Sequence, residues 1–275
     1  MGFFKRLSIS GKSKAPSSAP PAPLPDSSSS SPPHIAPKTS RPPAAPAAAA
    51  TGLDKRTEDA LRQLAKYDTV FLVDDSGSME PVWDSTVAPA LAAVVETAVQ
   101  YDEDGVDLCF FNARETAAST TSADECLAVF RRVRPRSTTP TKDAVRRVLE
   151  PYLQSLEQWQ VTGKAQGLPR PKPLNLVILT DGAPDRNQNP EDVLVDVARR
   201  LDQGRFPPFQ VGCSFVQIGN YSDATEHLRS LDDDLKQKHG IRDMVDTTLF
   251  EGSCDTSYLL KALLGGINRS IDRQS

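Results

Sequence analysis

The sequence predicts an α/β fold: a three-layer, doubly wound, mostly parallel sheet with helices on both faces, preceded by a disordered N-terminal tail. Short runs of residues that are apolar on both faces alternate with longer segments whose apolar residues recur at helical spacing. Strands of this kind are typical of a parallel sheet that helices cover on both sides. The composition also changes abruptly near residue 52, where a segment rich in Pro, Ser and Ala ends.

The N-terminal segment is too poor in apolar residues to fold alone. Residues 1–52 contain 11 of the 23 prolines and few large apolar residues after Leu7. Such a segment buries too little apolar surface to offset the entropy of ordering it, so we expect disorder. The chain is therefore predicted to consist of a tail, residues 1–52, and one domain, residues 53–275, which is long enough for a sizeable core.

Charge is distributed unevenly between these two parts. The tail carries a net charge of +5 and the whole chain −4, so residues 53–275 carry −9. An acidic domain is unsuited to nucleic acid and suits cations, and we expect no nucleic-acid partner. We expect a loose tail here, and the apolar and basic residues at positions 3–7 leave a weak contact with an anionic membrane as the alternative.

Cysteine spacing and hydropathy indicate in which cellular compartment the protein resides. The four cysteines are not spaced as a metal-binding knuckle, and no apolar stretch is long enough for a signal-peptide core or a membrane span. Free cysteines are typical of a reducing compartment. We therefore expect a cytoplasmic protein.

The folded part is predicted to alternate strand and helix. Helical spacing near residues 87–98 contains Pro89, so that helix begins or kinks there. The loop at 162–173 is rich in Gly, Pro and Lys. The expected strands are 69–74, 105–112, a short edge strand within 115–120, 174–182, 209–218 and 244–249. The expected later helices are 124–133, 142–159, 189–203, 224–238 and 258–271.

Polar residues follow two of these strands where each strand ends. The stretch 74–78, Asp-Asp-Ser-Gly-Ser, follows the first strand, and 180–182, Thr-Asp-Gly, follows another. Ligands of open α/β sheets bind beyond the carboxyl ends of the strands. Both stretches are therefore predicted to meet at one rim of the sheet.

Two catalytic interpretations of this rim lack a partner residue. A serine nucleophile needs a nearby general base, but His34 lies in the tail, and His227 and His239 lie on or after a late helix. An aspartyl nucleophile of the haloacid-dehalogenase-like phosphatase kind needs a second Asp two residues after the first, where this chain has Ser76. A hydroxyl is a poor proton carrier near neutral pH. A magnesium-dependent, phosphatase-like hydrolase therefore stays only as an alternative.

A metal site is the third interpretation of the rim. Asp74, Ser76 and Ser78 are spaced i, i+2 and i+4 where a strand becomes a turn, and such a turn can direct several oxygens to one point. Hard divalent cations prefer oxygen ligands. The alternative is that Ser76 or Ser78 caps the helix that follows.

Three motifs together resemble a von Willebrand factor type A (vWA) domain with its metal-ion-dependent adhesion site. They are "VDDSGSM", the loop "STTPT" and "LTDGAP", and the resemblance extends over residues 67–271, a Rossmann-like arrangement. It implies a metal site whose members are Asp74, Ser76, Ser78, Thr139 and Asp181.

The roles of some residues in these motifs stay undecided. Thr138 and Thr141 are alternatives to Thr139, and Asp75 fills a variable position, where we expect a solvated carboxylate. The family loop is usually Gly-rich before its threonine, whereas this chain has Arg136-Ser137-Thr138.

The same resemblance implies a function. Such domains are not enzymes: they bind Mg²⁺, or Mn²⁺ or Ca²⁺ in its place, and an Asp or Glu of a protein partner completes the metal shell. The stretches "VQIGNYSDATEHLRSLDDDL" and "LLGGINRSID" resemble small stand-alone intracellular vWA proteins of fungi. The rival expectation is a degenerate scaffold that binds through a metal-independent surface. Partner identity and oligomeric state stay open.

Overall fold

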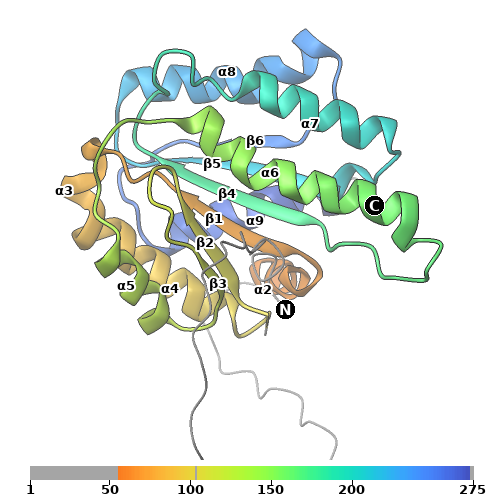
Figure 1. The fold of residues 1–275 in the computed structure, drawn as a ribbon. Coiled ribbons are helices and arrows are strands. Elements are labelled where there is room, and N and C mark those ends of the chain that lie inside the picture. The colour runs from red at the N-terminus through yellow and green to blue at the C-terminus, as the bar shows by residue number, and fades with distance from the viewer. Residues whose placement is uncertain (1–54, 103, 273–275) are drawn as a thin grey trace, which may run out of the picture. The chain divides into compact units, whose positions relative to one another are not determined.

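The computed structural model describes residues 55–102 and 104–272. The predicted disordered tail lies outside these residues, as does the proposed membrane contact at positions 3–7. The described chain forms one six-stranded sheet (Figure 1). Its strands are β1 (Asp68–Val73), β2 (Val106–Phe110), β3 (Ala117–Thr120), β4 (Leu174–Thr180), β5 (Val211–Gln217) and β6 (Val245–Thr248).

The sheet is parallel apart from one edge strand, as the sequence predicts. The strand order is β3-β2-β1-β4-β5-β6, and only β3 runs antiparallel to its neighbour. The chain leaves β1 toward β2 on one side and later returns to β4 on the other side. Ligand crevices of open α/β sheets form at such a reversal of strand order. The carboxyl ends of β1 and β4 are therefore the expected place for a site.

Helices cover both faces of this sheet (Figure 1). One layer is formed by α6, α7 and α8, which pack against each other in that order, and the other contains α2, α4 and α9 with α5 packed on α4. Their bounds are α2 (Lys55–Gln63), α3 (Glu80–Val82), α4 (Ala88–Ala98), α5 (Ala123–Arg132), α6 (Thr141–Gln158), α7 (Glu191–Gln203), α8 (Ser222–His239) and α9 (Thr256–Asp272).

Burial explains why the strands read as unbroken apolar runs. Every residue of β4 is buried, and in β1 only the first residue, Asp68, is not. Alternate residues such as Val70 and Phe71 point to opposite faces, and each face is covered by helices. The apolar stripe of α9 is also core, since Leu259, Leu260, Leu263 and Leu264 are buried.

Two helices, α2 and α4, differ in detail from what the sequence predicts. The helix α2, followed by a 3₁₀ turn at Leu64–Lys66, was not predicted; it buries Leu61 and Leu64 and packs against α9. Pro89 lies in the first turn of α4, which begins at Ala88. A π-helical turn, Trp83–Val87, runs directly into α4, so the helical backbone continues from α3 and is locally widened just before Pro89.

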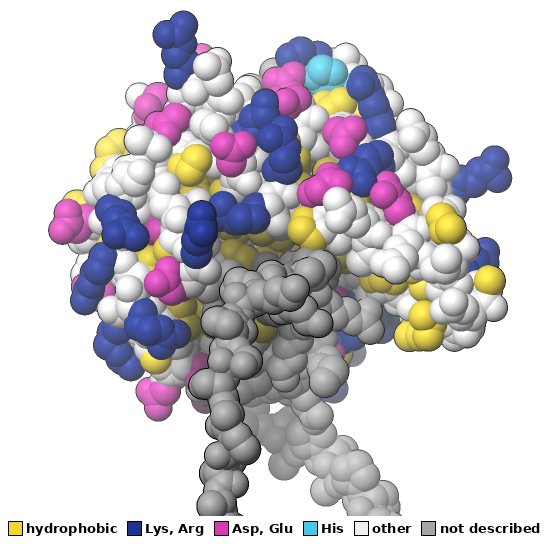
Figure 2. Space-filling view, in the orientation of Figure 1, with side chains coloured by type: hydrophobic (Ala, Val, Ile, Leu, Met, Phe, Trp, Pro, Cys, Tyr) yellow, Lys and Arg dark blue, Asp and Glu magenta, His cyan; other side chains and the backbone are white. Residues whose placement is uncertain are grey.

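The surface shows no segregation of charge on the side seen in Figure 2. Basic and acidic side chains are interspersed there, with small groups of hydrophobic side chains between them. Large exposed hydrophobic residues are few among the described residues: Val161, Leu168 and Tyr221. Within residues 55–102 and 104–272, no helix combines the length and the apolarity that crossing a membrane requires.

Candidate functional site

Asp74 lies at the first position after β1 and is fully buried. Its backbone N–H donates to the carbonyl of Leu179 at 2.8 Å, which extends the β1–β4 ladder by one residue. Its Oδ1 accepts from the backbone N–H of Ser76 at 2.9 Å, and its Oδ2 accepts from the hydroxyl of Thr180 at 2.7 Å. Both carboxylate oxygens therefore have partners, which fixes the turn after β1 to the end of β4.

A chain of side-chain contacts runs on from this turn to the end of β4. The hydroxyl oxygens of Ser76 and Ser78 lie 3.0 Å apart, and Ser78 Oγ donates to Asp181 Oδ1 at 2.9 Å. Asp181 follows β4 directly, 103 residues after Ser78. The structure thus brings Asp74, Ser76, Ser78 and Asp181 together at one rim, as the strand-end argument predicts.

The alternative interpretation of the two serines as helix caps finds no support. Ser76 precedes the 3₁₀ helix Gly77–Met79, but its side chain makes no capping hydrogen bond. Ser78 lies inside that turn, and its hydroxyl contacts Ser76 and Asp181 instead. Both hydroxyls therefore face the rim rather than the helix end.

The threonine loop is docked onto this turn through backbone atoms. Gly77 donates its N–H to the Ser137 carbonyl at 3.2 Å, and Arg136 donates to the Asp75 carbonyl at 2.7 Å. Ser137 has φ of +70°, a conformation that favours glycine, at a position where the resembling motif is Gly-rich. The loop thus keeps a glycine-like path without a glycine.

Among the three threonines, Thr139 is the one whose backbone Asp185 holds in place. It is buried, and Asp185 clamps it: Asp185 Oδ2 accepts from the Thr139 N–H at 3.0 Å, while the Asp185 N–H donates to the Thr139 carbonyl at 3.1 Å. Thr138 is exposed, and the Thr141 hydroxyl bonds back to the Thr139 carbonyl. In the described part of the chain, no hydrogen bond joins the Thr139 hydroxyl to the other four residues.

The expectation that Asp75 is a solvated carboxylate is wrong. Asp75 is fully buried. Its Oδ1 accepts from the backbone N–H of Asn112 at 2.7 Å and from Asn112 Nδ2 at 3.2 Å, and its Oδ2 accepts from the Ala113 N–H at 2.9 Å. Asp75 therefore holds the loop after β2 against the turn after β1. The sequence gives no signal for this role.

The electrostatics of the rim are those of buried acids. Burial raises the pKa of Asp74 to about 6, although hydrogen bonds from Thr180 and Ser76 oppose the rise. Burial likewise raises the pKa of Asp181, against the bond from Ser78. In residues 55–102 and 104–272, no basic side chain forms an ion pair with either carboxylate. Removing carboxylates from water without a counter-charge is unfavourable, so the rim favours a bound cation.

The donor set fits a hard divalent cation. It consists of the hydroxyls of Ser76, Ser78 and Thr139 and the carboxylates of Asp74 and Asp181, all of them oxygen donors, and it contains neither sulfur nor imidazole. No group of three or more His, Cys, Asp or Glu side chains with metal-holding geometry occurs in the described residues. Such a group is not required here, because three of the five side chains are hydroxyls.

One family model and several solved structures are similar to this chain. The family model described as von Willebrand factor type A domain matches residues 68–248. Solved structures with a similar chain path include the manganese-loaded TRAP protein of Plasmodium vivax, at 16% identity and a TM-score of 0.41, covering 73% of this chain and 74% of that one. Another is proximal thread matrix protein 1 from the mussel byssus, at 18% identity and a TM-score of 0.38.

These comparisons differ in how much of each protein they cover. The alignment with the byssus protein covers 73% of this chain but 47% of that chain. Among curated proteins, none matches this sequence. The family match, in contrast, runs from the first residue of β1 to the last residue of β6. Because it spans well over half of the chain, the protein belongs to the von Willebrand factor type A domain family.

Proposed function

We propose that this protein is a divalent-metal-dependent protein-binding module, and that Mg²⁺, or Mn²⁺ or Ca²⁺ in its place, binds at Asp74, Ser76, Ser78, Thr139 and Asp181. One observation carries the proposal. The turn after β1 and the turn after β4 are joined by a connected series of contacts from Thr180 through Asp74 and the backbone N–H of Ser76 to the hydroxyls of Ser76 and Ser78 and on to Asp181. The two buried carboxylates in this series, Asp74 and Asp181, form no ion pair with a basic side chain of the described residues.

Each residue has a distinct part in the proposed site. The hydroxyls of Ser76, Ser78 and Thr139 supply neutral oxygen ligands. Asp74 has both oxygens engaged, so it acts by orienting Ser76 and the end of β4. Asp181 accepts from Ser78 through Oδ1 and so fixes the direction of that hydroxyl. When bound, the cation supplies a Lewis-acidic position for one more anionic oxygen.

The partner chemistry follows from this donor set. Neutral hydroxyls leave a divalent ion short of negative charge, and a partner's Asp or Glu carboxylate forms a charge-assisted contact in a partly dry interface. The rim also carries basic Arg136 on the exposed threonine loop, which favours an acidic partner segment. We therefore propose an acidic protein partner rather than a small substrate.

We further propose that the protein is not an enzyme and acts in the cytoplasm. The position that a phosphatase would use for its acid is Ser76, whose hydroxyl contacts Ser78. The four cysteines are free and buried, as suits a reducing compartment. A generic phosphate-ester assay with Mg²⁺ should show no turnover above a chelated control.

The first test is calorimetric titration of Mg²⁺ and Mn²⁺ into the full chain. Ser78→Ala should weaken binding by about tenfold or more, the loss of roughly one charge-assisted contact. Ser85→Ala is the matched control, because Ser85 is also exposed and its hydroxyl bonds only to Pro81 and Thr86. Equal affinity in all three proteins would refute the assignment of the site.

The second test concerns the partner. Proteins captured by the full chain in Mg²⁺ should be lost in EDTA and absent from the Ser78→Ala capture. Capture that persists undiminished in EDTA would contradict metal dependence and favour a scaffold that binds through another surface.

A further inference from the structure

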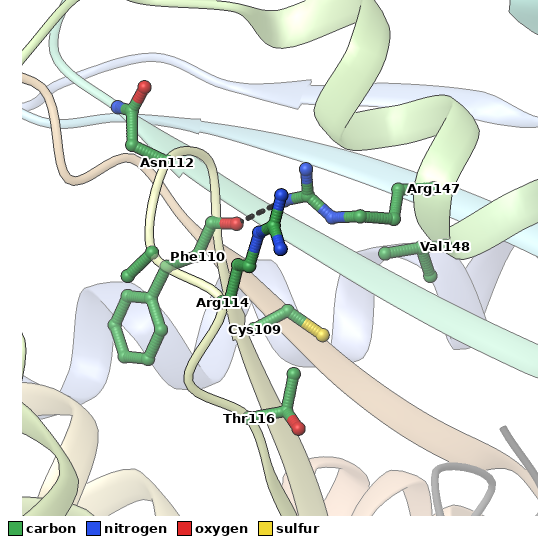
Figure 3. A pocket seen from close by; sticks show the side chains of 8 residues that line it. Cys109, Phe110, Asn112, Arg114, Thr116, Arg147 and Val148 are labelled. Carbon is green, nitrogen blue, oxygen red and sulfur yellow. Dashed lines mark hydrogen bonds between the residues drawn. The ribbon is translucent and has the colours of Figure 1, made fainter. Parts of the chain in front are cut away.

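A pocket of about 550 Å³ lies beside the candidate metal site, between the loop after β2 and helix α6. Cys109 and Val148 contribute apolar walls, and Arg114 and Arg147 contribute charge. Both arginine side chains line this pocket, Arg114 from the loop after β2 and Arg147 from α6 (Figure 3). A volume of this size is typical of a small-molecule or side-chain binding site.

The two guanidinium groups differ in how they are held. Arg147 Nη2 donates to the backbone carbonyls of Phe110 and, at 3.1 Å, Phe111, so its position above the end of β2 is fixed (Figure 3). Arg114 is exposed and makes no hydrogen bond within the described residues. Its loop is nevertheless anchored, because the preceding residues Asn112 and Ala113 bond to the buried carboxylate of Asp75.

Neither guanidinium has an acidic counterpart. No ion pair joins Arg114 or Arg147 to an Asp or Glu of the described residues. Arg200 shows the contrast, since it pairs with Glu150 at 2.7 Å and with Glu157 at 2.8 Å. Two like charges that line one pocket repel each other, and an anion bound in the pocket would turn that repulsion into favourable contacts with both.

We propose that this pocket binds the phosphate group of an organic phosphate monoester through Arg114 and Arg147. A phosphate monoester carries a charge of −1.5 to −2 near neutral pH and offers three acceptor oxygens, which matches two guanidinium forks. A single carboxylate satisfies only one such fork. The apolar walls at Cys109 and Val148 suit the organic part of the ester better than free inorganic phosphate does.

The test uses phenyl phosphate as the probe and the full chain in EDTA. EDTA removes divalent cations, so the outcome does not depend on the proposed metal site, and a failure of either proposal can be told from a failure of the other. Calorimetry should show saturable binding that weakens with added NaCl, because the contacts are ionic. Phenyl phosphate should bind more tightly than inorganic phosphate or benzoate.

Three variants locate the binding. Arg114→Ala should weaken phenyl phosphate by about tenfold or more, the equivalent of one charge-assisted contact, and it removes no internal hydrogen bond. Arg147→Lys should also weaken it, because an ammonium lacks the planar fork. Arg146→Ala is the matched control, as Arg146 is exposed on the same helix and pairs with Asp143. Absent binding, or equal binding by Arg114→Ala and Arg146→Ala, would overturn the proposal.

A second arm identifies the source of the phosphate. A phosphotyrosine peptide is titrated beside its unphosphorylated form and beside phenyl phosphate. Tighter binding of the phosphopeptide than of phenyl phosphate, lost without the phosphate, would support a phosphorylated protein as the source. Binding of phenyl phosphate alone would support a small ester. Binding of neither would refute the site.

Discussion

Replacement of Asp75 by alanine should destabilise the protein far more than its place in a polar turn suggests. The substitution leaves the backbone N–H groups of Asn112 and Ala113 without their acceptors, and the bond from Ala113 is buried. A buried donor without a partner costs about 1–3 kcal/mol. The half-buried N–H of Asn112 adds less, so the free energy of unfolding should fall by about 2–4 kcal/mol in all, a large part of the stability of a typical domain.

A graded series sharpens this prediction. Asp75→Asn keeps one carbonyl oxygen, which can serve Asn112, but it turns an amide group toward the Ala113 N–H, so about half of the loss should remain. Asp84→Ala is the control, because Asp84 is exposed and forms only a surface ion pair with Arg134; its cost should be at most about 1 kcal/mol.

Urea denaturation of the full chain, followed by tryptophan fluorescence and by circular dichroism, measures these free energies. Trp83 is buried beside the ring of Phe130, so its emission should report on the core. The expected order of loss is Asp75→Ala, then Asp75→Asn, then Asp84→Ala. An Asp75→Ala protein as stable as the Asp84→Ala control would refute the structural role assigned to this carboxylate.

Three further outcomes are expected. Trp83→Ala should lower the free energy of unfolding by about 3–5 kcal/mol in urea denaturation, because it empties a fully enclosed site; a loss below about 1 kcal/mol would contradict the packing. Burial raises the pKa of Asp68 to about 6, above its unfolded value of 3.8, so its contribution to stability is complete below pH 3.8 and is lost as pH rises through 6. Asp68→Asn should therefore be more stable than the parent at pH 8 by about 1 kcal/mol, after allowance for partial exposure, and an unchanged pH profile of stability would argue against this. Thr139→Ala should weaken Mg²⁺ binding in calorimetry by about tenfold whereas Thr138→Ala, at an exposed position, should not; the reverse order would move the threonine ligand to Thr138.

The sheet could be predicted because its strands are buried on both faces. Every residue of β4 is buried, so the sequence shows an apolar run that only a covered parallel strand explains. Helix α2 could not be predicted in the same way. Its burial rests on few residues, among them Ala60 and Leu61, and it depends on contact with α9 at the other end of the domain.

The grouping of polar residues at one rim of the sheet could be predicted from the sequence because of the topology of the sheet. Asp74 and Asp181 each follow a strand directly, and parallel neighbours must end at the same edge. Metal binding there stays a prediction. The role of Asp75 and the pairing of the two arginines in one pocket could not be foreseen, because both depend on how the loop after β2 folds. Arg114 and Arg147 lie on different elements, and no spacing rule relates them.

The path of β1 determines how force would pass through the protein. Helix α2 leads through one short turn into the first residue of β1, and the last residue of β1 is joined directly to Asp74. If a partner held at this rim were pulled against an anchor before residue 55, the tension would run along the covalent backbone of Asp68–Val73. The covalent backbone of β1 would then carry the load, while the ladders to its parallel neighbours, β2 and β4, would keep the strand paired on both sides. Tension in that direction would therefore not act first on the hydrogen bonds of the sheet.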